Sequence, residues 1–244
     1  MKAVVLAGGK GTRLAPYTKI LPKPLMPIGD MPILEILLRQ MKTYGVDEVV
    51  ITVGHLAELM RAFFQDGHRL ELKIDYSFEN HPLGTAGPIS LISGLDETFM
   101  VCNGDVLTTL NMKELVDYHK EKGAIATIAA HERKVKIDFG VIETNGDYEI
   151  TGYIEKPCYD FYVSMGVYIF EPRVLSYIKY NEYLDLPNLI IRLMEAGEKV
   201  ASYPYSGYWM DLGRIDDYEH AVVEFEKIKP QILGEDSLLP NNET

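Results

Sequence analysis

Near its start the chain reads Val4-Val5-Leu6-Ala7-Gly8-Gly9-Lys10-Gly11-Thr12-Arg13-Leu14. Residues 4–6 are apolar and mostly β-branched, as is typical of a buried strand. The glycines that follow allow the backbone to approach a ligand closely, and successive amides in such a turn can surround phosphate oxygens. Arg13 adds a planar guanidinium that matches phosphate geometry. The stretch therefore predicts a strand that ends in an anion-binding loop.

Two better-known phosphate-binding motifs do not fit this loop. A P-loop ends in Gly-Lys followed by Ser or Thr, and this loop lacks that ending. A dinucleotide-binding fingerprint needs a third small residue where Leu14 stands, followed by a helix. Prolines instead favour an irregular segment, at Pro16, Pro22, Pro24 and Pro27. These departures argue against an NAD-dependent oxidoreductase.

A lysine between two prolines follows, in Pro22-Lys23-Pro24-Leu25. The prolines restrict the backbone on both sides, so that Lys23 leaves a stiff loop in few directions. Such a lysine is a candidate phosphate ligand; a solvated surface lysine is the alternative.

The rest of the chain divides into two patterns. Up to residue 130, apolar runs alternate with helical patterns, which predicts an α/β fold with a mostly parallel sheet flanked by helices. Strands then follow one another, two of them joined by Asn145-Gly146-Asp147. We expect one domain: an NTP-binding half over 1–135, a smaller β-rich half over 136–212, and a C-terminal helix and tail over 213–244. Expected helices span 56–64, 84–95, 112–122, 173–178, 186–196 and 215–228, with another between the caps Asp30 and Gly45; expected strands span 4–6, 49–53, 72–76, 99–102, 125–130, 137–143, 148–154, 163–170, 200–205 and 208–210.

Composition narrows the function classes. The chain has 244 residues and a formal net charge of −12, which disfavours binding to nucleic acid or to an anionic membrane. Its two cysteines, Cys102 and Cys158, have no zinc-site spacing and suggest no disulfide framework. No apolar stretch approaches the roughly 20 residues of a membrane span, and no signal peptide is recognised, so we expect a cytoplasmic protein.

The glycine-rich loop and the Pro-Lys-Pro-Leu segment together resemble the signature of the sugar-1-phosphate nucleotidyltransferase family. The resemblance implies a Rossmann-like twisted sheet with a sugar-binding lobe, and no β-helix extension is expected. It implies that Arg13 and Lys23 bind the NTP phosphates as catalytic residues, that Mg²⁺ is the cofactor, and that the partners are an NTP and a sugar 1-phosphate. It leaves a homo-oligomer open. A non-catalytic regulatory relative is an alternative, but such relatives usually lose one of the residues that this chain keeps.

Two aspartates are the candidate metal ligands. Asp105 ends the apolar strand before it in Asn103-Gly104-Asp105, and Asp211 follows Trp209-Met210. Carboxyl ends of parallel strands face the ligand crevice, and two carboxylates can hold a Mg²⁺ that also binds water and phosphate oxygens. Either residue alone could be a helix cap or a turn residue. The resemblance assigns both to the metal.

The resemblance also marks a site for the sugar phosphate. Gly140, in Asp138-Phe139-Gly140-Val141, matches a strand whose glycine leaves room for the sugar ring, with phenylalanine replacing the usual tyrosine. Glu155 and Lys156, in Ile154-Glu155-Lys156-Pro157, match residues that bind sugar hydroxyls and the sugar's phosphate; an exposed charged turn is the alternative. Gly166 matches a glycine that backs the sugar.

The loop from Glu79 to Pro88 should line the base pocket. Relatives that use thymidine or uridine nucleotides carry glutamine where Glu79 stands. A carboxylate can accept from the two adjacent donors of guanine, so we expect GTP, with a mannose- or heptose-like sugar; UTP, dTTP and CTP remain alternatives. The expected nucleotide-binding residues are Leu6, Ala7, Gly8, Gly9, Gly11, Thr12, Glu79, Pro82, Gly84, Thr85, Asn103 and Gly104.

Overall fold

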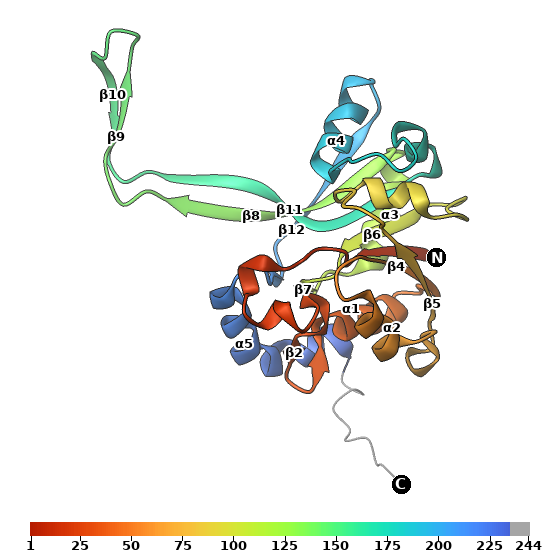
Figure 1. The fold of residues 1–244 in the computed structure, drawn as a ribbon. Coiled ribbons are helices and arrows are strands. Elements are labelled where there is room, and N and C mark those ends of the chain that lie inside the picture. The colour runs from red at the N-terminus through yellow and green to blue at the C-terminus, as the bar shows by residue number, and fades with distance from the viewer. Residues whose placement is uncertain (235–244) are drawn as a thin grey trace.

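A seven-stranded sheet runs through the computed structural model, which describes residues 1–234 (Figure 1). Four of its six strand pairings are parallel, and only β11 runs antiparallel to both of its neighbours. This arrangement confirms the predicted α/β fold with a mostly parallel sheet. In spatial order the strands are β12 (Val200–Tyr205), β8 (Ala126–Lys136), β11 (Cys158–Phe170), β6 (Phe99–Asn103), β1 (Lys2–Leu6), β4 (Glu48–Val53) and β5 (Lys73–Phe78).

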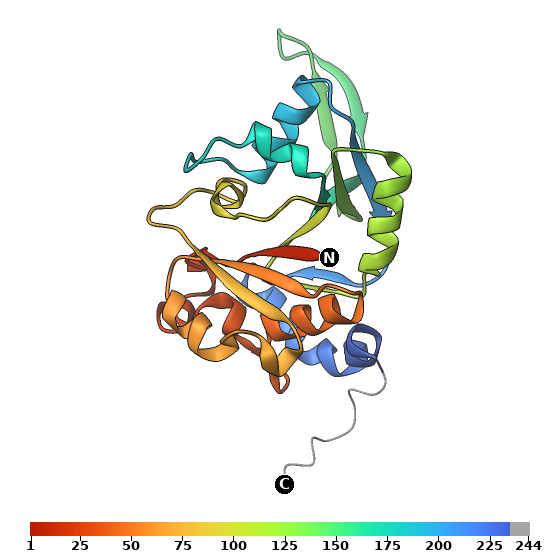
Figure 2. The same cartoon turned by 90° about the vertical axis from the view of Figure 1, so that its right-hand side faces the viewer.

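Helices cover both faces of this sheet (Figure 2). Alternate residues of β1 pack in opposite directions: Ala3 and Val5 belong to one core with α1, α2 and α3, whereas Val4 belongs to a second core with α4. A third core joins α5 to the outer side of α1. The α-helices are α1 (Ile33–Thr43), α2 (Ala57–Phe64), α3 (Met112–Lys122), α4 (Leu186–Glu195) and α5 (Ile215–Leu233).

Shorter elements connect this frame. The 3-10 helices are η1 (Thr12–Leu14), η2 (Tyr17–Lys19), η3 (Lys23–Leu25), η4 (His68–Leu70), η5 (Gly87–Leu91) and η6 (Pro172–Tyr177). Three small antiparallel pairs join β2 (Pro27–Ile28) to β3 (Met31–Pro32), β7 (Val106–Thr108) to β13 (Trp209–Asp211), and β9 (Val141–Thr144) to β10 (Ile150–Ile154). The pairing of β7 with β13 matters for function because it brings the chain after Asp105 alongside Asp211.

The β-rich part forms a long arm rather than a lobe packed on the body. β8 and β11 pair with one another as far as Lys136 and Cys158, well beyond the rest of the sheet. The β9–β10 hairpin extends the arm further, away from the helices (Figure 1). We call residues 131–164 the arm.

Two predicted features were wrong for identifiable reasons. Asp30 does not cap α1: Gly29, with φ +60°, and Asp30 form the turn between β2 and β3, and the Asp30 carboxylate accepts a hydrogen bond from Lys229 (3.0 Å). Residues 84–95 do not form an α-helix. They contain only the 3-10 helix η5, because the backbone N–H groups of Ala86 and Gly87 both donate to the Leu184 carbonyl (2.8 and 2.9 Å).

Other elements were predicted closely. α3 spans Met112–Lys122 as expected, because the Asn111 side chain accepts from two backbone N–H groups at its start and Gly123, with φ +55°, ends it. The expected turn at 145–147 joins β9 and β10. Across residues 1–234, every helix is too short or too polar to cross a membrane.

Candidate active site

A pocket of about 730 Å³ opens at the carboxyl ends of β1, β4 and β6. Leu6 ends β1, Asn103 ends β6, and Gly54 directly follows β4, so three parallel strands deliver their polar loops to one cavity. This is the edge at which open α/β sheets bind ligands. The volume suits a small phosphorylated molecule.

The glycine-rich loop forms the floor of this pocket. The Ala7 N–H donates to the Thr52 carbonyl of β4 (3.1 Å), which continues the strand pairing into the loop. Gly11 then takes φ +59°, and a Cβ at this position would lie 2.9 Å from the Thr18 methyl group. The Thr18 hydroxyl donates to the Gly11 carbonyl (2.8 Å). The loop is therefore held in one shape that glycine alone fits without strain.

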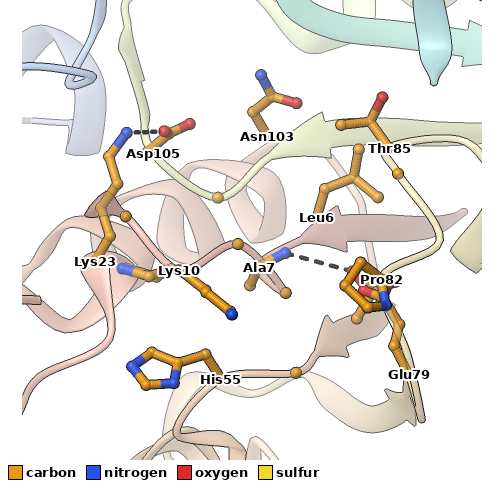
Figure 3. Close-up of a pocket in the computed structure, with 18 of the residues that line it drawn as sticks. Leu6, Ala7, Lys10, Lys23, His55, Glu79, Pro82, Thr85, Asn103 and Asp105 are labelled. Carbon is orange, nitrogen blue, oxygen red and sulfur yellow. Dashed lines mark hydrogen bonds and ion pairs between the residues drawn. The ribbon is translucent and has the colours of Figure 1, made fainter. Parts of the chain in front are cut away.

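Lys23 and Asp105 form an ion pair inside the pocket (Figure 3). Lys23 begins η3, whereas Asp105 follows β6, so the pair joins the proline-rich loop to the centre of the sheet. Both side chains are largely shielded, with 11% and 20% of their surface exposed. A cation and an anion thus face the cavity side by side, in a position to interact with phosphate and metal respectively.

Asp211 adds a second carboxylate to this cluster. Its strand β13 pairs with β7, and the Leu212 N–H donates to the Asp105 carbonyl (3.2 Å). Desolvation and the charge of Asp105 raise the pKa of Asp211, while Lys23 and Arg13 lower it. A Cβ at Gly213 would lie 3.1 Å from the Asp211 carboxylate and 3.4 Å from the Arg13 guanidinium, so these two groups face the same small space.

The two carboxylates fit a Mg²⁺ ion. No cluster of three or more potential metal ligands occurs among residues 1–234, so an all-protein cage is absent from the part of the chain that the structure describes. Mg²⁺ is commonly held by one or two carboxylates together with water and substrate phosphates. Desolvation and repulsion by Asp105 both raise the pKa of Asp211, and a shared cation would offset both by stabilising the ionised carboxylate.

The opposite end of the pocket is formed by residues 79–85. Glu79 accepts the Leu83 N–H (3.0 Å), and burial raises the pKa of its carboxyl. Thr85 is held by residues about a hundred positions further along the chain. Its N–H donates to Asp185 (3.1 Å), and its hydroxyl accepts the Leu186 N–H (2.7 Å) at the start of α4. This segment is therefore a braced loop rather than the start of a helix.

Most of the residues expected at the site lie together. Asp211 adjoins the cluster through Asp105, and Gly166 lies against Asn103, because a Cβ at Gly166 would come within 2.6 Å of the Asn103 amide. Thr12 is not among the residues that line the pocket. The expected residues that do line it are Leu6, Ala7, Gly8, Gly9, Gly11, Arg13, Lys23, Glu79, Pro82, Gly84, Thr85, Asn103, Gly104 and Asp105.

The other expected sugar-site residues lie elsewhere. Gly140, Glu155 and Lys156 are on the arm, and none of them lines the pocket. Glu155 and Lys156 expose 61% and 58% of their side chains, and Lys156 has φ +44°. The structure of one chain therefore does not bring this group to the nucleotide end of the site.

Among the side chains that line the pocket without having been predicted as site residues are Lys10, His55 and Tyr183 (Lys10 and His55 are labelled in Figure 3). Two of them carried a usable signal. Lys10 lies inside the glycine-rich loop, and His55 follows Gly54 at the carboxyl end of an expected strand. Tyr183 carried none, because only the tertiary fold brings it next to Thr85: its hydroxyl donates to Asp185 (2.6 Å), which binds Thr85.

The fold and the pocket define an α/β protein with an anion-binding loop and two carboxylates at the carboxyl edge of its sheet. The profile of the nucleotidyl transferase family matches residues 2–228. The chain therefore belongs to this family, as the resemblance of its loop motifs predicted.

Curated relatives make the family more specific. The chain is 36% identical over 242 residues to a UTP–glucose-1-phosphate uridylyltransferase of Synechocystis sp., covering 91% of this chain and 62% of that one. It is 34% identical over 223 residues to a mannose-1-phosphate guanylyltransferase of Mycobacterium tuberculosis, covering 88% and 62%. Its family is thus that of the sugar-1-phosphate nucleotidyltransferases, and the chain spans somewhat less than two thirds of these relatives' length.

Solved structures share the fold. A putative glucose-1-phosphate thymidylyltransferase from Bacillus anthracis matches with a TM-score of 0.73 and 21% identity, over 100% of this chain and 98% of that one. The HddC protein of Yersinia pseudotuberculosis matches with a TM-score of 0.70 and 24% identity, over 92% and 99%. At these identities the likeness supports the fold alone.

Proposed function

We propose that this protein transfers a nucleotidyl group from an NTP to a sugar 1-phosphate, giving an NDP-sugar and pyrophosphate. The observation that carries the proposal is the convergence of the glycine-rich loop, Arg13, Lys23 and Asp105 on one cavity at the carboxyl edge of the sheet. The family and its curated relatives point to the same reaction.

The reaction requires alignment and charge neutralisation rather than a general base. A phosphate oxygen of the sugar 1-phosphate attacks the α-phosphorus of the NTP, and the bond from that phosphorus to the oxygen bridging to the β-phosphate breaks. Because a phosphate monoester is already an anion near pH 7, no side chain must remove a proton. Arg13 and Lys23 hold the NTP phosphates in line and offset the charge that passes to pyrophosphate.

Asp105 and Asp211 are the residues that would hold Mg²⁺. The ion would supply a Lewis acid that binds phosphate oxygens near the reacting phosphorus. Lys23 contacts the Asp105 carboxylate, so it also orients one of the two metal ligands. Arg13 and Asp211 both border the small space beside Gly213.

GTP is the nucleotide that we favour, with Glu79 as the residue that reads the base. Glu79 lines the pocket, and its contact with Leu83 fixes one carboxylate oxygen while leaving further acceptor capacity. Adjacent donors on guanine match a carboxylate better than the alternating edge of uracil does. UTP is the second candidate, because the Synechocystis relative is a uridylyltransferase.

The sugar phosphate would be bound by Gly140, Glu155, Lys156 and Gly166, and we favour a mannose- or heptose-like sugar. Gly166 lies beside the pocket through Asn103. Lys156 would supply the cation for the sugar's phosphate, and Glu155 would accept from sugar hydroxyls.

The experiment that tests this proposal is a matrix of GTP, UTP, dTTP and CTP against mannose, glucose and heptose 1-phosphates, read as pyrophosphate release. We expect release only when both substrates and Mg²⁺ are present, with GTP preferred. Pyrophosphate release from none of the pairs would contradict the reaction. A preference for UTP would leave the reaction standing and contradict the assignment of Glu79.

A further inference from the structure

A second segment of the chain closes the end of the pocket that lies opposite the carboxylates. The Leu184 N–H donates to the Leu83 carbonyl (2.9 Å). The Leu184 carbonyl in turn accepts the N–H groups of Ala86 and Gly87 (2.8 and 2.9 Å). These bonds join the loop before α4 to the loop after β5, and the two loops lie side by side (Figure 2). A Cβ at Gly84 would lie 2.6 Å from the Leu184 carbonyl oxygen, so the two backbones meet here with no side chain between them.

This pairing turns Tyr183 toward the pocket. The Leu184 side chain is 5% exposed and packs in the core that also holds residues of α4. Asp185 continues the chain in an extended conformation, with φ −92° and ψ 150°. Successive side chains of an extended segment point to opposite sides, so Tyr183 points away from the core. It lines the pocket and is 58% exposed, which leaves an aromatic ring uncovered at the edge of the cavity.

Hydrogen bonds hold this ring in place. The Tyr183 hydroxyl donates to one carboxylate oxygen of Asp185 (2.6 Å), and the other oxygen accepts the Thr85 N–H (3.1 Å). Because the hydroxyl already has a partner, Tyr183 offers a ligand the face of its ring. A side chain that is fixed before the ligand arrives loses little conformational entropy on binding.

The place of the ring in the pocket indicates which part of a ligand it meets. Lys23 and Asp105 lie at one side of the cavity (Figure 3). Glu79 and Thr85 lie at the other side. Phosphates belong beside the lysine and the glycine-rich loop. The base is the part of an NTP that lies farthest from its phosphates, so it reaches the end of the pocket where Tyr183 is held.

We propose that the ring of Tyr183 stacks on the base of the bound NTP, and that Asp185 is a positioning residue that holds this ring beside the base. The role of Tyr183 rests on the proposed function, because it takes an NTP as the ligand. Every base has a flat π-face, so stacking on an aromatic side chain adds affinity without selecting one base. Selection stays with Glu79, whose carboxylate meets the edge of the base.

Calorimetric titration with GTP, UTP, dTTP and CTP, in the presence of Mg²⁺ and without a sugar 1-phosphate, tests the stacking contact. We expect Tyr183→Ala to raise the Kd by about five- to a hundredfold for every nucleotide that the wild type binds. Tyr183→Phe keeps the ring and should lose less affinity than the alanine variant. Tyr180→Ala is the matched control and should leave the Kd unchanged, because Tyr180 is 78% exposed and does not line the pocket.

Two results would overturn the stacking contact. One is a Tyr183→Ala variant that binds each nucleotide as tightly as Tyr180→Ala does. The other is a loss of affinity for one nucleotide with none for another, since Tyr183 would then read the edge of the base. A wild type that binds no NTP would instead contradict the proposed function.

The positioning role of Asp185 needs a separate pair of variants. Asp185→Ala frees the Tyr183 hydroxyl, so it should raise the Kd for NTP in the same titration while kcat changes little. Asp185→Asn keeps an oxygen that can accept the Thr85 N–H and has an amide that can donate to the tyrosine oxygen, so it should restore most of the affinity. A residue that only stabilised the fold would lower the Tm and leave the Kd, measured well below the Tm, unchanged. That result for Asp185→Ala would refute the positioning role.

Discussion

Replacement of Lys23 by methionine isolates the charge on which the nucleotide end of the site depends. The change keeps an unbranched side chain only one atom shorter than lysine and leaves Asp105 without its partner. Breaking a fully buried ion pair costs about 3–5 kcal/mol of the free energy of unfolding. Because the Asp105 side chain is 20% exposed, we expect this variant to lose about 2 kcal/mol. For a domain of this size that corresponds to a fall in Tm of roughly 4–8 °C.

The same change should reduce turnover much more than stability. Loss of one positioned cation at developing phosphate charge lowers kcat by about 10²–10³, which is roughly 2.7–4 kcal/mol of transition-state stabilisation. Scanning calorimetry through the unfolding transition, and pyrophosphate release measured well below it, separate the two effects. The matched control is Lys10→Met, which removes an exposed lysine from the same pocket and should leave Tm nearly unchanged. Retention of more than about a tenth of wild-type kcat in Lys23→Met would refute the role of this lysine.

Three further changes have distinct expected outcomes. The raised pKa of Asp211 means that its ionised form opposes folding. Asp211→Asn should therefore raise the Tm of the metal-free protein at pH 7, and it should abolish turnover. The gain in Tm should disappear below the ordinary aspartate pKa of 3.8, where the carboxyl is protonated in both the folded and the unfolded state. Asp105→Asn should instead lower Tm, since it breaks the ion pair with Lys23. A higher Tm for Asp105→Asn than for Asp211→Asn would contradict the stabilising role given to the Asp105 charge and the destabilising role given to that of Asp211. Gly84→Ala should lower the free energy of unfolding by about 2–4 kcal/mol in chemical denaturation, because φ is +77° and a Cβ would lie 2.6 Å from a backbone carbonyl oxygen. Gly146→Ala is the control and should be nearly neutral, because no heavy atom lies within 4 Å of its added methyl group. Equal losses in the two variants would contradict the steric explanation. Glu79→Gln should lower the ratio of kcat/KM for GTP to that for UTP by about ten- to a hundredfold, and an unchanged ratio would move base reading to the backbone of the loop.

Local signals determined which parts of the fold could be predicted from sequence. α3 has the predicted bounds, and the two residues that fix its ends, Asn111 and Gly123, act on their immediate neighbours. Residues 84–95 had a helical pattern, but their backbone bonds to Leu184, about a hundred positions away. Asp30 has the chemistry of a helix cap, yet the β2–β3 turn places it next to Lys229. Tertiary contacts decided both of these outcomes, and no local pattern encodes them.

The candidate site was predictable to a similar extent. The loop of residues 8–14 and Lys23 could be recognised because each belongs to a motif of contiguous residues with chemistry suited to phosphate. The direction of the arm could not be recognised from the sequence. The alternation of apolar and polar residues identified its strands, but no local pattern indicated that Glu155 and Lys156 would lie away from the pocket. That direction depends on where β8 and β11 leave the sheet.

In the proposed reaction, the sugar phosphate attacks the α-phosphorus of the NTP within this pocket. The most direct test follows the reaction by phosphorus NMR, with ¹⁸O placed in the phosphate of the sugar 1-phosphate. We expect the label to enter the oxygen that bridges the two phosphorus atoms of the NDP-sugar, and unlabelled pyrophosphate to form in equal amount. Label in the pyrophosphate, or release of orthophosphate without an NDP-sugar, would contradict it.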